Sequence, residues 1–193
     1  ETKIETDRRR IDTKIARLTS KTNPNLLLLG YNKAAKEVRN VCIIPKHFFV
    51  PDIVQKRKPL APTARRAGWV GSNILLNLVP ESGRIFVLRN GVPEAKDEVL
   101  AKWQQTAFLR EQSVEARGWL IEVMKAVEAI GRPEFELDDV YRFEQRLGAL
   151  YPGNNNVRPK IRQQLQVLRD HGYLEFLGRG RYRLRSLTQE RAS

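Results

Sequence analysis

The side chains best suited to chemistry in this sequence are hydrogen-bond donors gathered between positions 157 and 185. This stretch holds eight Lys or Arg residues against two acids, Asp170 and Glu175. Guanidinium groups bind phosphates and the edge of guanine, and carboxamides bind the edge of adenine. The chemistry that this composition predicts is therefore recognition of DNA through its phosphates and its major groove.

The expected role of each side chain depends on its place in the stretch. Amide and guanidinium groups on a helix suit base edges, whereas arginines on a hairpin suit phosphates. Asparagines ahead of the helix could hydrogen-bond phosphate as well. The base-reading candidates are Arg162, Gln163 and Gln166, with Arg158 and Lys160 as further DNA-binding candidates on the same helix; the phosphate candidates are Asn154, Asn155, Asn156, Arg179 and Arg181.

A helix followed by a two-stranded wing is predicted to position these side chains. Apolar residues recur at spacings of four, four and three, which marks one buried face of a helix. Pro159 suits its first turn and Gly172 ends it. Aromatic and aliphatic runs at 173–177 and 181–184 flank Gly178-Arg179-Gly180, which supplies the glycines of a tight hairpin turn. The apolar face consists of Val157, Ile161, Leu165 and Leu168.

Two further segments with helical apolar spacing, 116–130 and 137–150, precede this unit. Three helices followed by a hairpin make a winged helix. We therefore predict a winged-helix DNA-binding domain over residues 112–186, followed by a tail at 187–193. Two alternatives remain open: a small packed domain whose charges are merely solvated, and a winged helix that contacts protein only.

A second basic segment, residues 56–73, contains no acid and shows little periodicity. Its prolines and glycines predict a long ordered loop, and loops of this length inside a compact domain are usually functional or disordered. Trp69 argues against disorder, although it could be a core plug as readily as a base contact. The candidate DNA-binding residues of this loop are Arg57, Lys58, Arg65, Arg66 and Trp69.

The chain ahead of the winged helix alternates strand-like and helix-like segments. Apolar runs at 26–30, 41–44 and 84–89 are bounded by turn residues and predict strands buried on both faces of a sheet. A helix is expected at 95–109, and another, capped by Asp7, near the start of the chain. The predicted fold class is α/β, with a mixed-sheet domain over residues 1–111.

Composition narrows the class of protein. A formal net charge of +13 favours a polyanionic partner and a steeply salt-dependent affinity. No run approaches the roughly 18 apolar residues of a membrane span, and no signal-peptide pattern opens the chain, so an intracellular protein is expected. Cys42 stands alone, which excludes a disulfide framework and a cysteine zinc site. His47 and His171 have no nearby histidine or cysteine and are expected to be structural.

Five long segments of the sequence form a recognisable signature: RKPLAPTARRAGWVG (57–71), SGRIF (82–86), ARGW (116–119), VYRFE (140–144) and KIRQQLQVLRDHGYLEFLGRGRYR (160–183). They resemble the Dam-replacing family of restriction endonucleases, the family of DpnI, over about residues 10–184. The resemblance implies a nuclease domain of the PD-(D/E)xK type ahead of a winged helix. It further implies a bacterial cytoplasmic enzyme that uses Mg²⁺ and cuts double-stranded DNA at G-A-T-C containing N6-methyladenine.

The family's nuclease motif is an Asp followed, on the next strand, by Glu-x-Lys. The carboxylates hold Mg²⁺ and the lysine steadies developing negative charge. Through this resemblance Glu1 and Lys3 are the catalytic candidates, and Glu1 is the candidate metal ligand. The preceding Asp and the family's cysteine zinc site have no counterpart here, and Asp7 and Asp12 suit a helix cap and a surface position better. Glu1 and Lys3 could also be merely solvated terminal charges.

We expect the parent protein to be a nuclease and this chain alone, which begins at Glu1, to be catalytically incomplete. The competing hypothesis is a non-catalytic winged-helix DNA-binding protein or methyladenine reader. Double-stranded DNA is the expected partner in both cases, and in the first it is adenine-methylated. No membrane association is expected, and the oligomeric state stays open, a monomer included.

Overall fold

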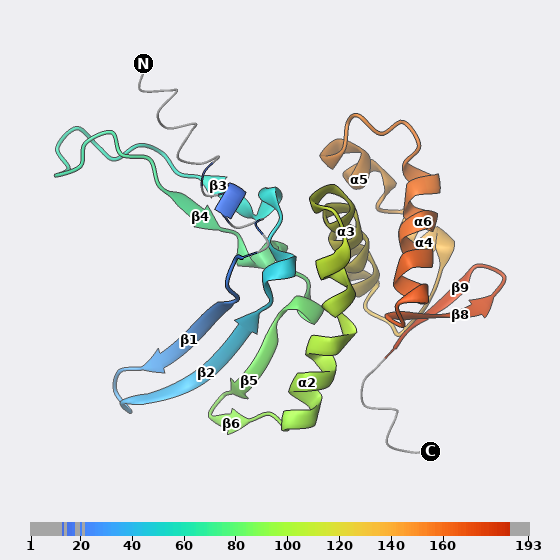
Figure 1. The fold of residues 1–193 in the computed structure, drawn as a ribbon, viewed down its shortest axis with the longest axis horizontal. Coiled ribbons are helices and arrows are strands. Elements are labelled where there is room, and N and C mark those ends of the chain that lie inside the picture. Colours follow the sequence, from blue (N-terminus) through green and yellow to red (C-terminus); the bar gives the residue numbers. More distant parts are fainter. Residues whose placement is uncertain (1–12, 14, 18–19, 21, 186–193) are drawn as a thin grey trace.

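The computed structural model describes residues 13, 15–17, 20 and 22–185. In Figure 1 a sheet and a two-stranded ribbon lie on one side of the molecule, and a helical bundle with a small sheet lies on the other. The chain therefore follows the predicted order, a mixed α/β part and then a winged helix. The helix start predicted at Asp7 lies outside the described residues.

An antiparallel sheet of four strands forms the first part. Hydrogen bonds join its strands in the order β1-β2-β5-β6. The turn between the last two strands, Asn90-Gly91, has φ of 54° and 83°, the left-handed region that Asn and Gly tolerate best. The strands are β1 (Leu26–Asn32), β2 (Glu37–Ile44), β5 (Ile85–Arg89) and β6 (Val92–Pro93).

The strands predicted at 26–30, 41–44 and 84–89 are confirmed, but their burial on both faces is wrong. Leu27 and Leu29 are 56% and 62% exposed, while Leu28 on the other face of β1 packs against the core. Side chains alternate across a strand, and an antiparallel sheet can leave one face in solvent. An uninterrupted apolar run therefore does not distinguish one covered face from two.

A ribbon of two strands, β3 (Val54–Lys56) and β4 (Ser72–Ile74), carries the basic loop away from the sheet, as Figure 1 shows. The helix predicted at 95–109 is α2 (Lys96–Gln105) followed by the 3-10 helix η5 (Ala107–Glu111). Thr106, at φ −109° and ψ 1°, interrupts the α-helical path between them. Other 3-10 helices are η1 (Lys46–Phe48), η2 (Pro51–Ile53), η3 (Leu76–Leu78) and η4 (Glu81–Gly83).

The second part has the predicted winged-helix order. Its first helix, α3 (Val114–Ile130), begins where Ser113 Oγ accepts a hydrogen bond from the Ala116 amide at 3.2 Å. It ends at Gly131, whose φ of 72° suits a glycine cap. The small sheet has the order β7-β9-β8. The remaining elements are β7 (Glu134–Glu136), α4 (Leu137–Tyr141), α5 (Glu144–Leu150), α6 (Val157–Asp170), β8 (Leu174–Gly178) and β9 (Arg181–Leu184).

The single helix predicted at 137–150 is wrong, because α4 and α5 are separate. A turn closed by the Phe143 amide, which donates to the Val140 carbonyl at 3.0 Å, divides them. Val140 and Leu147 are both fully buried on opposite sides of this turn. The apolar spacing thus continues across the break, which periodicity cannot reveal.

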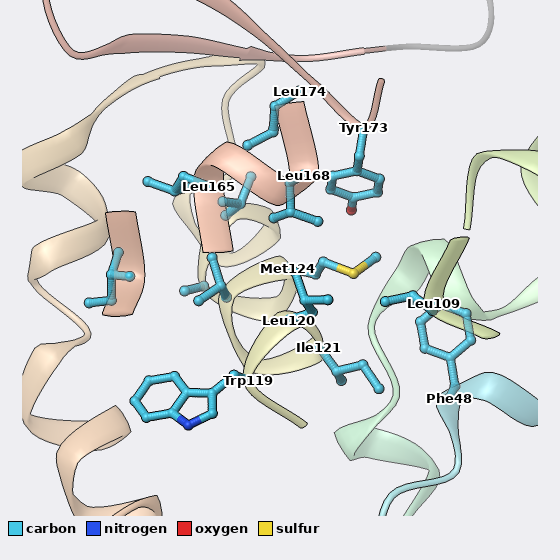
Figure 2. Close-up of a cluster of buried hydrophobic side chains, with 14 of the residues drawn as sticks. Phe48, Leu109, Trp119, Leu120, Ile121, Met124, Leu165, Leu168, Tyr173 and Leu174 are labelled. Carbon is cyan, nitrogen blue, oxygen red and sulfur yellow. The ribbon is translucent and has the colours of Figure 1, made fainter. Parts of the chain in front are cut away.

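One hydrophobic core spans both parts of the chain, as Figure 2 shows. Phe48 and Leu109 from the first part are fully buried in the same cluster as Met124 of α3, and so are Leu165 and Leu168 of α6. Each large apolar side chain buried in this way contributes about 1.5–3 kcal/mol. The two parts therefore stabilise one another, and their shared core takes residues from both sides of the boundary predicted at residue 111.

Polar contacts reinforce the junction between the two parts. The carboxylate of Glu128 on α3 accepts hydrogen bonds from the backbone amides of Glu81 and Ser82 at 2.7 and 3.0 Å. The same carboxylate accepts one from the Tyr173 hydroxyl at 3.1 Å. Glu128 thus satisfies the free amides at the start of η4 and ties the first part to the winged helix.

Candidate DNA interface

The helix α6 presents one apolar and one polar side. Ile161, Leu165 and Leu168 have no exposed surface, which confirms the predicted buried face. The side chains on the opposite side are exposed, and we call these four residues the reading face. They are Arg158, Arg162, Gln163 and Gln166.

Both arginines of the reading face are held by neighbours in α4 and α5. Arg158 donates from Nε to Glu144 at 2.7 Å, and this hydrogen bond raises the pKa of the Arg158 guanidinium. Arg162 donates from Nε to the hydroxyl of Tyr141. The Tyr141 ring also lies 5.0 Å from the guanidinium carbon of Arg158 and 5.7 Å from that of Arg162, within cation–π range. The structure thus fixes these two guanidinium groups relative to one another.

The polar residues around the start of α6 make local contacts. Lys160 donates from Nζ to Gln163 Oε1 at 2.9 Å. Asn154 Oδ1 accepts a hydrogen bond from the Asn156 amide at 2.8 Å, which shapes the turn that leads into the helix. The three asparagines line one side of an open pocket of about 630 Å³ that also includes Trp119 and Tyr151. The predicted asparagine candidates therefore lie at the start of α6, next to Lys160 and Gln163 of the helix.

The wing confirms the predicted hairpin. Its turn has three consecutive residues with left-handed backbone, Gly178, Arg179 and Gly180, at φ of 91°, 48° and 76°. The Gly180 carbonyl accepts from the Leu137 amide at 2.9 Å, which anchors the turn to the start of α4. Arg179 is exposed at the tip, whereas Arg181 forms an ion pair with Glu134 at 3.2 Å. The two predicted phosphate contacts of the wing therefore stand in different environments.

The basic loop is ordered by its own backbone. Arg57 donates from its amide to the Gly71 carbonyl at 2.9 Å, and Leu60 donates to the Trp69 carbonyl at 2.9 Å. The Gly68 amide donates back to the Leu60 carbonyl at 3.0 Å, with Gly68 at φ 73°. The predicted ordered loop is confirmed. Its basic side chains are exposed and, among the described residues, make no ion pair; they are Lys56, Arg57, Lys58, Arg65 and Arg66.

Trp69 is not a core plug, because 40% of it is exposed. Its ring lies against Gly71, where an added Cβ would stand 2.8 Å from Trp69 Cζ3. The indole can approach the backbone of residue 71 this closely because glycine has no Cβ. The loop therefore offers a supported aromatic surface together with basic side chains that make no ion pair within the described part of the chain.

The loop and the reading face lie far apart. Figure 1 shows the loop at one end of the long axis of the molecule and the winged helix toward the other. The structure thus brings the predicted DNA-binding residues together as two separate surfaces. A duplex that touches one surface needs a different part of its length, or a second duplex, to touch the other.

The predicted catalytic residues Glu1 and Lys3 lie outside the described residues. Across the ranges that the structure describes, no group of three or more His, Cys, Asp or Glu side chains could hold a metal ion. No helix in those ranges is both long and apolar enough to cross a membrane.

Both histidines have structural surroundings. His47 is buried and its Nε2 lies 3.1 Å from Thr106 Oγ1. Burial, and then the charges of Arg110, Arg117 and Lys46, lower the pKa of His47 to about 3. His171 stacks on Phe108 with ring centroids 4.5 Å apart. These contacts support the structural role predicted for each.

Sequence reasoning missed the residues that hold the basic side chains, namely Glu134, Tyr141 and Glu144. Each lies well before the arginine that it contacts, so no short motif joins the partners. The only available signal was the acidic and aromatic character of VYRFE ahead of a basic helix. The pairing itself depends on how α4, α5 and β7 pack.

Two family models match this sequence. Residues 4–112 match the model described as DpnI, the Dam-replacing family, and residues 115–184 match the Dam-replacing HTH domain. The matches follow the same order as the α/β part and the winged helix, and the first of them begins after Lys3.

Proposed function

Because this chain belongs to the Dam-replacing family, we propose that it acts in a methylation-dependent restriction endonuclease that binds and cuts double-stranded DNA at G-A-T-C with N6-methyladenine. The observation that carries this proposal is the reading face of α6, an exposed row of guanidinium and amide groups. Such a row matches the donor and acceptor pattern of a major groove. The buried opposite side of α6 keeps that row facing outward.

A methyl group on adenine N6 removes one donor hydrogen and adds a small apolar surface in the major groove. Burying one methyl contributes about 0.8 kcal/mol. A tenfold difference in affinity requires about 1.4 kcal/mol. One contact is therefore too weak for a strict sensor, whereas methylated sites read separately at the two protein surfaces multiply the discrimination.

We assign the apolar methyl contact of the first part to Trp69. Its partly exposed indole is supported by Gly71, and Arg65 and Arg66 of the same loop are unpaired among the described residues. In this proposal the arginines bind phosphate or guanine and position the duplex, while the indole covers the methyl. In the winged helix, the reading face is proposed to contact base edges, and Arg179 is proposed to bind phosphate.

Cleavage is proposed to depend on a divalent metal ion, Mg²⁺, as the family implies. The described residues contain no cluster of ligands that fits such an ion, so no catalytic step is derived from them. Glu1 and Lys3 remain our proposed catalytic pair, with Glu1 as metal ligand. In the parent nuclease, Glu1→Gln would then leave the binding of methylated DNA unchanged and slow its cleavage.

The experiment that tests this function measures binding and cleavage on two duplexes that differ only in N6-methylation of G-A-T-C. It is run at near-physiological salt with Mg²⁺, and again with EDTA. Preferred binding of the methylated duplex is expected, and strand cleavage that EDTA abolishes would further show that this chain carries a complete active site. Preferred binding without cleavage would fit a chain that is catalytically incomplete, as the sequence leads us to expect, or a methyladenine reader. Equal, salt-sensitive binding of both duplexes would contradict methylation dependence.

A further inference from the structure

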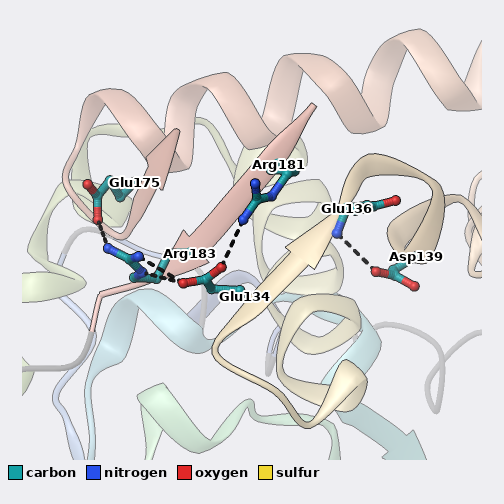
Figure 3. Close-up of polar contacts among 6 residues, drawn as sticks. All are labelled: Glu134, Glu136, Asp139, Glu175, Arg181 and Arg183. Carbon is teal, nitrogen blue, oxygen red and sulfur yellow. Dashed lines mark hydrogen bonds and ion pairs between the residues drawn. The ribbon is translucent and has the colours of Figure 1, made fainter. Parts of the chain in front are cut away.

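An ion-pair network covers the outer face of the wing sheet. Strand register places Glu134 of β7 and Glu175 of β8 directly opposite Arg183 of β9. Arg183 donates to Glu134 from Nε at 3.1 Å and from Nη2 at 2.8 Å, and to Glu175 from Nη1 at 3.1 Å. Figure 3 shows the guanidinium between the two carboxylates. All three of its nitrogens are engaged within the protein.

Glu134 also holds the next arginine of the wing. Its second oxygen accepts from Arg181 Nη2 at 3.2 Å, so one carboxylate binds two guanidinium groups. The hydrogen bonds and charge of Arg183, followed by those of Arg181, hold the pKa of Glu134 below its ordinary value. Glu134 is therefore ionised at neutral pH and offsets part of the positive charge of the wing.

We propose that Glu134 is a specificity-determining residue that restrains Arg181 and Arg183 from binding phosphates of unrelated DNA. This inference rests on the proposed function, in which the wing lies beside a duplex. Both arginines are within reach of a duplex, with 55% and 39% of their side chains exposed. A phosphate that approaches them meets a carboxylate that repels it and already occupies one nitrogen of Arg181 and two of Arg183.

The restraint affects unrelated and cognate DNA differently. Binding of unrelated DNA depends almost entirely on how many phosphates the protein neutralises. Such a duplex can shift along the protein to reach any arginine that is free. A cognate duplex is held in register by base contacts on the reading face and cannot shift in this way. A carboxylate that lowers the affinity for unrelated DNA more than the affinity for cognate DNA widens the difference between the two affinities. Specificity is this difference.

The test compares the full chain with its Glu134→Gln variant on a methylated G-A-T-C duplex and on an unrelated duplex, across a range of salt concentrations. We expect several-fold tighter binding of the unrelated duplex by the variant, with little change for the cognate one. The salt slope on the unrelated duplex should steepen by about 0.9 for each arginine that turns to a phosphate. Glu175→Gln, which affects Arg183 alone, should give a smaller change.

A matched control is Glu37→Gln. Glu37 pairs with Arg39 at 2.8 Å, with about half of each side chain exposed, so the variant removes the same charge from a similar pair. Figure 1 places the β1–β2 hairpin, which includes Glu37, away from the wing. If Glu134→Gln changed the salt slope no more than Glu37→Gln does, or tightened both duplexes equally, the inference would be wrong.

The two proposals fail in distinguishable ways. Equal binding of cognate and unrelated duplexes by the unaltered chain contradicts the proposed function. The change in salt slope between that chain and the Glu134→Gln variant is measured on unrelated DNA alone, so it still shows whether Glu134 restrains the arginines. Thermal unfolding of each variant confirms that the comparison is made between folded proteins.

Discussion

The basic loop and the winged helix carry the same kind of charge in different states. In the loop, Arg65 and Arg66 are exposed and make no ion pair with any acid among the described residues. In the winged helix, Arg158 forms an ion pair with Glu144 and Arg181 forms one with Glu134. The number of basic residues predicts that the partner is negatively charged, but it does not predict which of these residues are available to bind the partner. Availability depends on the acids that the fold brings alongside.

The largest effect is expected from the double substitution Arg65→Ala and Arg66→Ala. Hydrogen bonds to charged groups contribute about 1.5–3 kcal/mol each, so losing two should weaken DNA binding by roughly 100-fold or more. The salt slope should become shallower by about 1.8, at about 0.9 per phosphate. Titrations of methylated and unmethylated duplexes at several salt concentrations measure both quantities. A loss confined to the methylated duplex would contradict a phosphate-binding role.

Acid tests whether these contrasting regions share one fold. The ordinary pKa of histidine is 6.5, and the pKa of His47 in the folded protein is lowered to about 3. Between these two pH values His47 is protonated in the unfolded chain and neutral in the folded one. The stability contributed by neutral His47 is complete above pH 6.5 and is lost as the pH falls toward 3. Between pH 7 and pH 5 the loss should be about 2 kcal/mol.

Urea unfolding at the two pH values measures this loss, with His47→Gln as the variant in which it should shrink. The emission of the tryptophans and the far-ultraviolet circular dichroism should change together. Two separate transitions, one for each part of the chain, would contradict the shared core.

Trp69→Ala separates methyl sensing from charge. About 0.8 kcal/mol for one methyl corresponds to about fourfold in affinity, so the methylated-to-unmethylated ratio should fall by about that factor. Binding of the unmethylated duplex should change little by comparison. Gly71→Ala offers a matched variant that keeps the indole but displaces it, because the added Cβ would stand 2.8 Å from the ring. An unchanged ratio in both variants would remove Trp69 from the proposed methyl contact.

The smallest effect is expected from Arg158→Ala. Arg158 already has Glu144 as a partner at 2.7 Å, so fewer of its donors are available to a duplex. Because exposed pairs of this kind contribute little, affinity should fall by roughly threefold or less. The same titrations measure it. If Arg158→Ala weakened DNA binding as much as Arg65→Ala alone, an ion pair within the protein would not limit how well an arginine binds DNA.

Local patterns predicted most of the winged helix. The apolar spacing of Ile161, Leu165 and Leu168 indicated both the helix and its buried face, and the glycines at 178 and 180 indicated the wing turn. These features depend on neighbours in the sequence, which periodicity and turn chemistry describe.

Other features depend on residues that are distant in the sequence. The exposure of Leu29 follows from the antiparallel sheet that leaves one face of β1 uncovered. The pairing of Arg181 with Glu134 follows from the placement of β7 beside β9 in the sheet. In the sequence, three helices separate these two strands. Neither was predictable without knowing which strands are neighbours.

The core shared by Phe48, Leu109 and the helices α3 and α6 means that the winged helix is not a portable module. A fusion protein that borrowed residues 115–184 alone would expose to water the apolar surface that Phe48 and Leu109 cover. An engineer would have to bring η1 and η5 along, or replace that surface with polar side chains. For the same reason, the distance between the basic loop and the reading face is built into the fold and is not set by a linker.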